Sequence, residues 1–290
     1  MLKKKYTPVV IIGAPRSGTN MLRDILCQYK GVATWPCDEV NYIWRHGNAY
    51  YSSDVLPAEK ASKSIKKYII KQFDWVSRKY NATIVIEKTC ANSLRIPFVN
   101  AVLQDAKYIF IIRDGVDTIS SSRSKWNASF DISYILKKTR FIPLLDLPYY
   151  ATKYFFNRLH GLFSSNNSLK FWGPNLDRMT DIIKDKSLNE ICALQWKECV
   201  ESAEKSLSKI DKDKVLTVYY EELVQNPLAE LNRIISFIGL EATNERILST
   251  IKSISVCNIG KGRSALSHSE ITDIESIIAE TLKRHGYPRK

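Results

Sequence analysis

Residues 8–26, PVVIIGAPRSGTNMLRDIL, run an apolar strand into a glycine turn and then into a helix. The two glycines of the turn, Gly13 and Gly18, have the same separation as those of a nucleotide-binding phosphate loop. In such a loop the backbone N–H groups and the start of the following helix face an anion. This stretch therefore predicts an α/β fold whose first strand leads into a phosphate-binding turn.

The turn lacks the residues on which nucleotide triphosphatases depend. Thr19 stands where those enzymes have lysine, and Asn20 follows where they have a magnesium-binding hydroxyl residue. Arg16, inside the loop, supplies a positive charge instead. The loop is therefore expected to hold a phosphate group, but not that of a substrate for ATP or GTP hydrolysis.

The composition predicts one large basic domain. The chain has 290 residues, 44% of them hydrophobic, which is enough to bury the core of a single domain spanning residues 1–290. Its net charge of +13 indicates an anionic partner: nucleic acid, a membrane surface or a polyanionic small molecule. Nucleic acid is the weakest of these because no recognition pattern accompanies the basic residues. No apolar run has the length of a membrane span or of a secretory signal, so we expect a cytoplasmic protein. Peripheral contact of the protein with the inner face of a membrane stays open as an alternative.

The six cysteines are scattered, without a CxxC pair or histidines at metal-ligand spacing. They are expected to be reduced, mostly buried thiols. The sequence thus predicts neither a disulfide framework nor a metal site.

Apolar strands alternate with helical segments along the chain, which favours a doubly wound parallel sheet covered by helices on both faces. Ligands of such sheets bind beyond the carboxyl ends of the strands. The glycine turn, Lys88 and Arg113 are therefore expected along one edge. Residues 127–190, rich in aromatic and basic side chains, are expected to form a helical insertion over this active face. The predicted strands are 7–13, 83–89, 106–114 and 214–223, and the predicted helices include 19–29, 60–80 and one from Pro227 to Gly239.

Two motifs carry a resemblance to a known family. PRSGTNML at 15–22 resembles the 5′-phosphosulfate loop of sulfotransferases that use 3′-phosphoadenosine 5′-phosphosulfate (PAPS) and release 3′-phosphoadenosine 5′-phosphate (PAP). IIRDGVDTISSS at 111–122 resembles the element with which that family binds the 3′-phosphate, through an arginine and a serine eight positions later. Further segments along the chain are similar to the tyrosylprotein and bacterial members. The resemblance implies a P-loop-like fold and PAPS as the sulfuryl donor, without a metal.

The resemblance also implies which residues bind the donor. Residues 16–20 would hold the 5′-phosphosulfate, while Arg113 and Ser121 would hold the 3′-phosphate. IGKGRSALS at 259–267 occupies the place of the family's last nucleotide-binding loop, although it equally fits an ordinary flexible turn. The nucleotide-binding residues expected on this basis are Arg16, Ser17, Gly18, Thr19, Asn20, Arg113, Ser121, Lys261, Gly262 and Arg263.

The same comparison implies the catalytic residues. Glu39 matches the segment in which the tyrosylprotein enzymes carry their catalytic glutamate, and burial beside two tryptophans, Trp35 and Trp44, would raise its pKa. Asp38 is the rival base and His46 ranks third. Lys88 matches the lysine of the family's Glu-Lys-Thr element, so it is expected to stabilise the sulfuryl group and the departing oxygen, with Arg16 sharing that charge.

The acceptor is the least constrained part of the interpretation. FWGPNL at 171–176 resembles a Trp-Gly-Pro motif of bacterial members, whose acceptors are largely carbohydrates and lipids. A hydroxyl group of a carbohydrate or glycolipid is therefore the expected acceptor. Two other classes stay open: a P-loop kinase, which would need the missing loop lysine, and a non-enzymatic basic module that binds membranes or polyanions.

Overall fold

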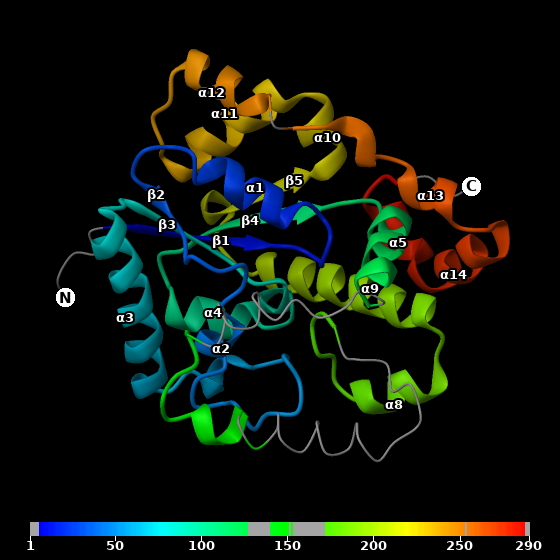
Figure 1. Ribbon diagram of the computed structural model, residues 1–290, viewed down its shortest axis with the longest axis horizontal. Helices are drawn as coiled ribbons and strands as arrows, with labels where there is room; N and C mark the ends of the chain where they lie inside the picture. Colours follow the sequence, from blue (N-terminus) through cyan, green and yellow to red (C-terminus); the bar gives the residue numbers. More distant parts are fainter. Residues whose placement is uncertain (1–5, 127–139, 151, 153–171, 253, 288–290) are drawn as a thin grey trace.

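The computed structural model describes residues 6–126, 140–150, 152, 172–252 and 254–287. Five parallel strands form one sheet in the order β2-β3-β1-β4-β5, so β1 lies in the middle (Figure 1). The register pairs Ile11 of β1 with Lys88 of β3, and Ile12 with Phe110 of β4. The carboxyl ends of these three strands thus meet at one edge. The strands are β1 (Thr7–Ile12), β2 (Val32–Ala33), β3 (Ile84–Lys88), β4 (Lys107–Ile112) and β5 (Val215–Tyr219).

The central strands are apolar because both of their faces are buried. Alternate residues of a strand point to opposite faces, and accordingly Val9 and Ile11 belong to one hydrophobic cluster while Val10 and Ile12 belong to the other. Helices that cover both faces of a parallel sheet explain why these strands read as continuous apolar runs. The doubly wound parallel fold expected from the sequence is confirmed.

A layer of helices covers the face of the sheet that is uppermost in Figure 1. The helix after β1 begins directly at the phosphate loop, and three more follow β5 along the chain. One of them ends at Gly239, which takes the left-handed conformation at the helix end, as the sequence predicted. These helices are α1 (Thr19–Leu26), α10 (Tyr220–Gln225), α11 (Pro227–Ile238) and α12 (Asn244–Ile251).

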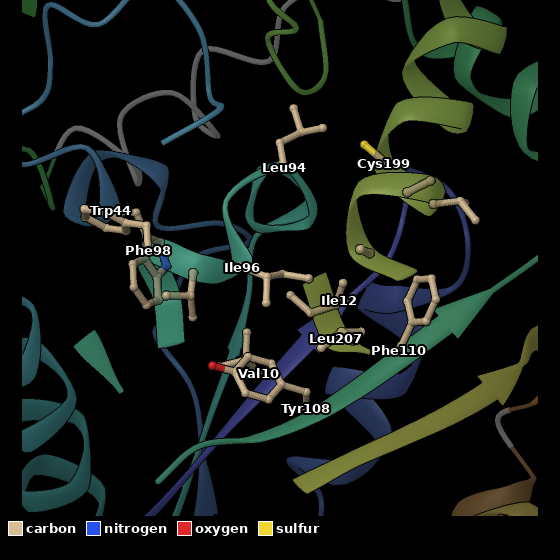
Figure 2. Close-up of a cluster of buried hydrophobic side chains, with 14 of the residues drawn as sticks. Val10, Ile12, Trp44, Leu94, Ile96, Phe98, Tyr108, Phe110, Cys199 and Leu207 are labelled. Atoms are coloured by element: carbon tan, nitrogen blue, oxygen red, sulfur yellow. The ribbon is translucent and has the colours of Figure 1, made fainter. Parts of the chain in front are cut away.

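The opposite face carries the larger core, which Figure 2 shows between the sheet and two helices. Val10, Ile12 and Phe110 of the sheet belong to the same buried cluster as Phe98 of α4 and Leu207 of α9. α9 is the long helix beneath the sheet in Figure 1. The elements of this side and of its edges are α2 (Asn41–Trp44), η1 (Ala58–Lys60), α3 (Lys63–Tyr80), η2 (Cys90–Leu94), α4 (Ile96–Val102), α5 (Gly115–Trp126), α8 (Met179–Asp185), α9 (Leu188–Leu207), η3 (Lys212–Lys214), α13 (Lys261–Ala265) and α14 (His268–Arg284). η4 (Val256–Asn258) lies against α10.

The last predicted strand is shorter than expected. Residues 214–223 were predicted as a strand, but β5 ends at Tyr219 and α10 begins at Tyr220. Two glutamates, Glu221 and Glu222, occupy the first turn of that helix, where carboxylates are favourable. The strand therefore ends where the acidic residues begin.

Most of the insertion predicted at 127–190 lies outside the described residues. Of its described residues, 140–150 pack against α3, because Phe141 contacts Trp75 with ring centroids 6.1 Å apart, and 172–190 include α8. At the other end the predicted range overlaps α9, which begins at Leu188 behind a Ser187 capping box. Within the described part of the chain, no helix is long and apolar enough to cross a membrane. All six cysteines, which lie in described segments, are free thiols.

Candidate active site

The phosphate loop joins the end of β1 to the start of α1. Gly18 has a φ of 89°, in the left-handed region. A Cβ atom there would also lie 2.5 Å from Cδ2 of Tyr220, so only glycine fits. Arg16 is held at a φ of 69°, which a non-glycine residue adopts only when its surroundings impose it. This combination leaves the start of α1 facing outward at the edge of the sheet.

Two polar side-chain atoms, one in the loop and one at the start of α1, are buried and make no hydrogen bond within the described residues. They are the Ser17 hydroxyl and the Asn20 side-chain oxygen. Ser17 is fully buried, and α1 begins without a side-chain cap, so N–H groups of its first turn are also unsatisfied by any cap. Buried groups of this kind normally find a partner. A bound phosphate or sulfate oxygen would accept hydrogen bonds from the Ser17 hydroxyl and from the N–H groups of α1, so these donors fit the anion that the sequence predicted. The Asn20 oxygen is itself an acceptor and needs a donor instead.

Arg113 and Ser121 come to the same place as the loop. Arg113 follows β4 and donates to the Arg16 carbonyl at 3.0 Å and to the Asn258 carbonyl at 2.6 Å. Its guanidinium lies over the Tyr220 ring, 4.5 Å from the centroid. Nε of Arg16 donates to the Ser121 hydroxyl on α5 at 2.9 Å. The two anion-binding elements predicted from separate motifs are therefore neighbours.

These residues line one cavity of about 360 Å³. Cationic and hydroxyl groups dominate its walls, which suits a multiply charged anion. The residues that line it include Arg16, Arg113, Ser120, Ser121, Ser124 and Lys261.

The last predicted loop, 259–267, reaches the cavity with two of its three predicted residues. Lys261 and Gly262 line it, and Nζ of Lys261 bonds the Asn258 side chain at 3.2 Å. Arg263 instead pairs with Glu275 at 2.7 Å and with Asp114 at 3.3 Å. The guanidinium of Arg263 is thus committed to these two carboxylates, in contrast to its expected role on the nucleotide.

Asp117 is a site residue that the sequence interpretation missed. Its carboxylate accepts hydrogen bonds from the backbone N–H of Gly260 at 2.7 Å and of Gly262 at 2.6 Å. It also lies 3.7 Å from Arg113, which it orients. The four-residue spacing of Arg113 and Asp117 was a visible signal. Its bonds to the backbone N–H groups of Gly260 and Gly262 could not be predicted from the sequence, because nearly every residue carries such a group.

A second polar cluster lies at the end of β3. Nζ of Lys88 donates to Oε1 of Glu39 at 3.0 Å and lies 3.6 Å from Asp38, which also pairs with Arg23 at 2.8 Å. The Lys88 side chain is 2% exposed. Burial alone would lower the pKa of this amine, but the carboxylates of Glu39 and Asp38 outweigh it and raise the pKa above its ordinary value. Lys88 is therefore held as a cation at the active edge.

The three candidate bases have different surroundings. Burial would raise the pKa of Asp38, but the Lys88 and Arg23 cations outweigh it and lower that pKa. His46 lies apart from the cluster, with Nδ1 2.8 Å from Asp146. It lines a separate cavity of about 370 Å³ with Tyr68 and residues 142–145. Of the three, Glu39 and Asp38 contact Lys88.

The two tryptophans expected beside Glu39 pack elsewhere in the core. The rings of Trp35 and Trp44 both contact Phe73, with centroids 4.8 Å and 6.1 Å apart. What holds the Glu39 carboxylate is Lys88 and, at 3.3 Å, the backbone N–H of Cys90. The Glu39 carboxylate thus has a cation and a backbone amide beside it.

Glu87, next to Lys88 in β3, has a structural role. It is fully buried and accepts hydrogen bonds from Thr89 at 2.5 Å and from Asn92 at 2.7 Å. The Thr89 hydroxyl also receives the backbone N–H of Val40 at 3.2 Å. These bonds fasten the segment that carries Glu39 to the end of β3. Lys125, a further basic residue of α5, is exposed and does not line the cavity.

Within the described segments, no group of three or more histidine, cysteine or carboxylate side chains could hold a metal ion. Three protein cations, Arg16, Arg113 and Lys261, line the cavity together with one carboxylate, Asp117, which lies 3.7 Å from Arg113. Neutralisation of an anion in the cavity is therefore a task that the three cations can perform themselves.

Comparison with known proteins gives a family for this arrangement. Residues 6–289 match the family model described as the sulfotransferase domain. No curated protein sequence matches the chain significantly.

Solved structures match over nearly the whole chain. The sulfotransferase domain from the curacin biosynthetic pathway is 12% identical, covers 98% of this chain and 99% of its own, and has a TM-score of 0.58. The sulfotransferase domain from the Synechococcus PCC 7002 olefin synthase is 18% identical, covers 95% of this chain and 96% of its own, and has a TM-score of 0.53. Mouse sulfotransferase SULT7A1, solved in complex with PAP, is 12% identical, covers 97% of this chain and 86% of its own, and has a TM-score of 0.51. At these identities the likeness concerns the fold, a parallel sheet flanked by helices.

Proposed function

Because the chain belongs to the sulfotransferase family, we propose that it transfers a sulfuryl group from PAPS to a hydroxyl group of a carbohydrate or glycolipid. The observation that carries this proposal is the single cavity in which Arg16 of the phosphate loop meets Arg113 and Ser121. One nucleotide with phosphates on both sides of its ribose needs two such adjacent anion sites. The PAP complex of the mouse protein supports the same donor.

Each part of the donor has residues suited to it. Ser17 and the N–H groups at the start of α1 are suited to the 5′-phosphosulfate, since they are unpartnered donors beside a helix N-terminus. Arg113, Ser121 and Lys261 are suited to the 3′-phosphate, since they supply cationic and hydroxyl groups to the cavity wall. Arg263 acts indirectly, through Asp114.

In the proposed reaction, Glu39 removes the proton from the acceptor hydroxyl. When bound, PAPS supplies a sulfuryl group attached to a good phosphate leaving group. The new bond joins the acceptor oxygen to sulfur, the bond from sulfur to the 5′-phosphate oxygen breaks, and PAP carries the electron pair away. Lys88 and Arg16 neutralise the charge that develops on the leaving oxygen.

The 3.0 Å contact between Lys88 and Glu39 supports these paired roles. The Glu39 carboxylate helps to raise the pKa of Lys88 and so keeps the amine protonated. Arrival of the acceptor hydroxyl at Glu39 would free the ammonium group for the sulfuryl oxygens.

The acceptor side is proposed to lie near the Trp-Gly-Pro segment. Gln195 donates to the carbonyls of Trp172 and Pro174 at 3.0 and 2.9 Å, and the backbone N–H of Asn175 bonds Asp54 at 2.9 Å. Asp54 in turn accepts a hydrogen bond from Asn41, two residues after Glu39. These contacts support a link between the segment that resembles bacterial members and the proposed base.

The test is transfer of radiolabelled sulfate from PAPS to a panel of glycans and glycolipids, with ATP as the alternative donor. PAP affinity is measured in parallel by calorimetry for Arg113→Ala and for a control, Arg233→Ala, whose exposed guanidinium pairs with Glu230. Loss of one charged hydrogen-bond donor is expected to weaken PAP binding about tenfold to a hundredfold in Arg113→Ala. Phosphate transfer from ATP without sulfate transfer from PAPS would overturn the proposal.

A further inference from the structure

Half of the exposed large apolar side chains of the described residues lie at one place on the surface. Among the described residues eight large hydrophobic side chains are exposed, and four of them, Tyr50, Leu144, Leu145 and Leu147, belong to two adjoining segments. The segments meet where the Tyr50 ring packs on the Tyr149 ring, with centroids 4.4 Å apart. Leu144 and Leu145 are each 85% exposed. We name these four residues the leucine patch.

The segment that carries the leucines is anchored so that they stay outside. Asp146 is buried and bonds His46 at 2.8 Å, and Pro143 is buried beside it. Tyr150 packs on Tyr42 with ring centroids 4.7 Å apart. This segment buries its carboxylate and exposes its leucines, the reverse of the usual distribution in a soluble domain. Such an inversion indicates that the leucines have an apolar partner.

Basic side chains of α3 flank this patch. The patch segment lies along α3, which carries Tyr68 of the cavity shared with residues 142–145 and Trp75 in contact with Phe141 (Figure 1, segment in green). Exposed Lys71 is three residues after Tyr68 and four before Trp75, and therefore lies between them on the helix surface. Lys67 lies one turn before it, and Lys79 covers the Trp75 ring at 4.6 Å.

We propose that the leucine patch and the lysines of α3 dock this protein onto an anionic lipid bilayer. Exposed leucines with a tyrosine enter the boundary between headgroups and acyl chains, while adjacent lysines bind anionic headgroups. The net charge of +13 adds attraction to such a surface. A second copy of the chain would bring the same lysines against one another across a symmetric contact, so the charge favours lipid.

The proposed lipid contact does not depend on the transfer reaction. Bilayer binding needs neither PAPS nor Glu39. A failure here would leave the donor cavity and its chemistry as they stand, and a failure of sulfuryl transfer would leave the lipid contact.

The test is flotation of the full chain with vesicles of phosphatidylcholine alone or with an equal part of phosphatidylglycerol. We expect binding to the anionic vesicles, weakened by salt. Lys67→Glu/Lys71→Glu should lower the partition roughly thirtyfold or more, since each lysine near an anionic leaflet is worth about fivefold. Leu144→Asp/Leu145→Asp should abolish binding.

Matched controls are Lys209→Glu/Lys212→Glu and Leu228→Asp/Leu248→Asp, which change exposed residues elsewhere. They should bind like the unchanged protein. PAP affinity and the thermal unfolding midpoint, measured for every variant, show that each is folded. The proposal is overturned if the patch variants float like the controls, or if no variant binds. It is equally overturned if light scattering detects a dimer that the leucine changes dissolve while vesicle binding is absent.

Discussion

At the scale of single residues, the chemistry depends on how cations and carboxylates are paired. Lys88 contacts Glu39 and Asp38, whereas Arg263 is committed to Asp114 and Glu275. Basic residues that look alike in the sequence thus take different roles. Which role each takes depends on the carboxylate that the fold places beside it.

Removing the proposed base should slow turnover without loss of the nucleotide. We expect Glu39→Gln to lower kcat by about a hundredfold to ten-thousandfold, the usual contribution of a positioned base. Its affinity for PAP should change little, because Glu39 does not line the donor cavity. Steady-state kinetics and calorimetry measure the two effects.

The neighbouring carboxylate provides the control. Asp38→Asn keeps the shape of the side chain that receives Arg23 at 2.8 Å, and should lower kcat less than Glu39→Gln does. If the order of the two variants were reversed, Asp38 would be the base. A change in PAP affinity as large as the change in kcat would instead indicate a disturbed fold.

At the scale of elements, α13 closes the cavity by packing on α5 without a side chain between them. A Cβ atom on Gly262 would lie 2.5 Å from Cα of Asp117, whereas a Cβ atom on Gly260 would meet nothing within 4 Å. Gly260 has a φ of 73°, so alanine there strains the backbone only. Glycine is therefore needed at position 262 because there is no room for a side chain, and at position 260 only because of its backbone conformation.

Alanine substitutions at Gly260 and Gly262 should distinguish the effect of backbone strain from the effect of losing the contact between α13 and α5. Gly262→Ala has to push α13 away from α5, at a cost of about 1–3 kcal/mol of overpacking, and should weaken PAP binding through displacement of Lys261. Gly260→Ala should cost about 1 kcal/mol and leave PAP affinity nearly unchanged. Urea unfolding and calorimetry test this pair. Equal loss of PAP affinity in both variants would contradict the packing explanation.

The start of α14 gives the fold an acid-sensitive contact. Hydrogen bonds from Ser267 and from the side chains of Arg123 and Asn189 lower the pKa of Glu270 from 4.5 to about 2. Because the folded-state pKa is depressed, the stabilisation is complete above the unfolded pKa and is lost as the pH falls toward the folded value. Glu270 therefore favours the folded state at neutral pH and stops doing so in acid.

We expect Glu270→Gln to be less stable than the unchanged protein at neutral pH, with the difference shrinking between about pH 5 and about pH 3. Urea unfolding across this range measures it. Glu280→Gln, at an exposed position of the same helix, is the control and should show no comparable convergence. A pH-independent difference for Glu270→Gln would mean that its effect is not electrostatic.

At the scale of the whole molecule, the donor cavity joins distant parts of the chain. Arg16 comes from the first strand–helix turn, Arg113 from the end of β4, and Lys261 from a segment near the C-terminus. A ligand that contacts all three stabilises their common arrangement and not one loop alone.

PAP should therefore protect all three segments together from hydrogen exchange. At a concentration a hundred times its Kd, it should add about 2.7 kcal/mol to the free energy of unfolding. ADP, which lacks the 3′-phosphate, should protect residues 13–20 more than residues 113–121 or 256–265. Equal protection of all three segments by ADP at matched occupancy would argue against separate phosphate sites.

Much of this architecture was predictable, because strong local patterns specify it. The buried apolar strands and the glycine turn from Gly13 to Gly18 are encoded by neighbours in sequence, and so is the end of α11 at Gly239. Contacts between distant backbone atoms were not predictable. The Asn258 carbonyl on Arg113 and the partners of Arg263 depend on how the last segments dock, which no local pattern records.

Two hydrogen bonds join the Asp117 carboxylate of α5 to the backbone N–H groups of Gly260 and Gly262. On the side of the glycine segment these bonds therefore involve main-chain atoms alone. The position of this segment therefore does not depend on the side chains of Ser264 and Ala265, provided that Gly262 stays at the point of contact. Arg263 has to stay as well, because it pairs with Asp114 and Glu275. Ser264 and Ala265 can be exchanged without moving the segment itself. This makes the segment a natural site for an engineer who wishes to reshape the rim of the cavity while its floor stays intact.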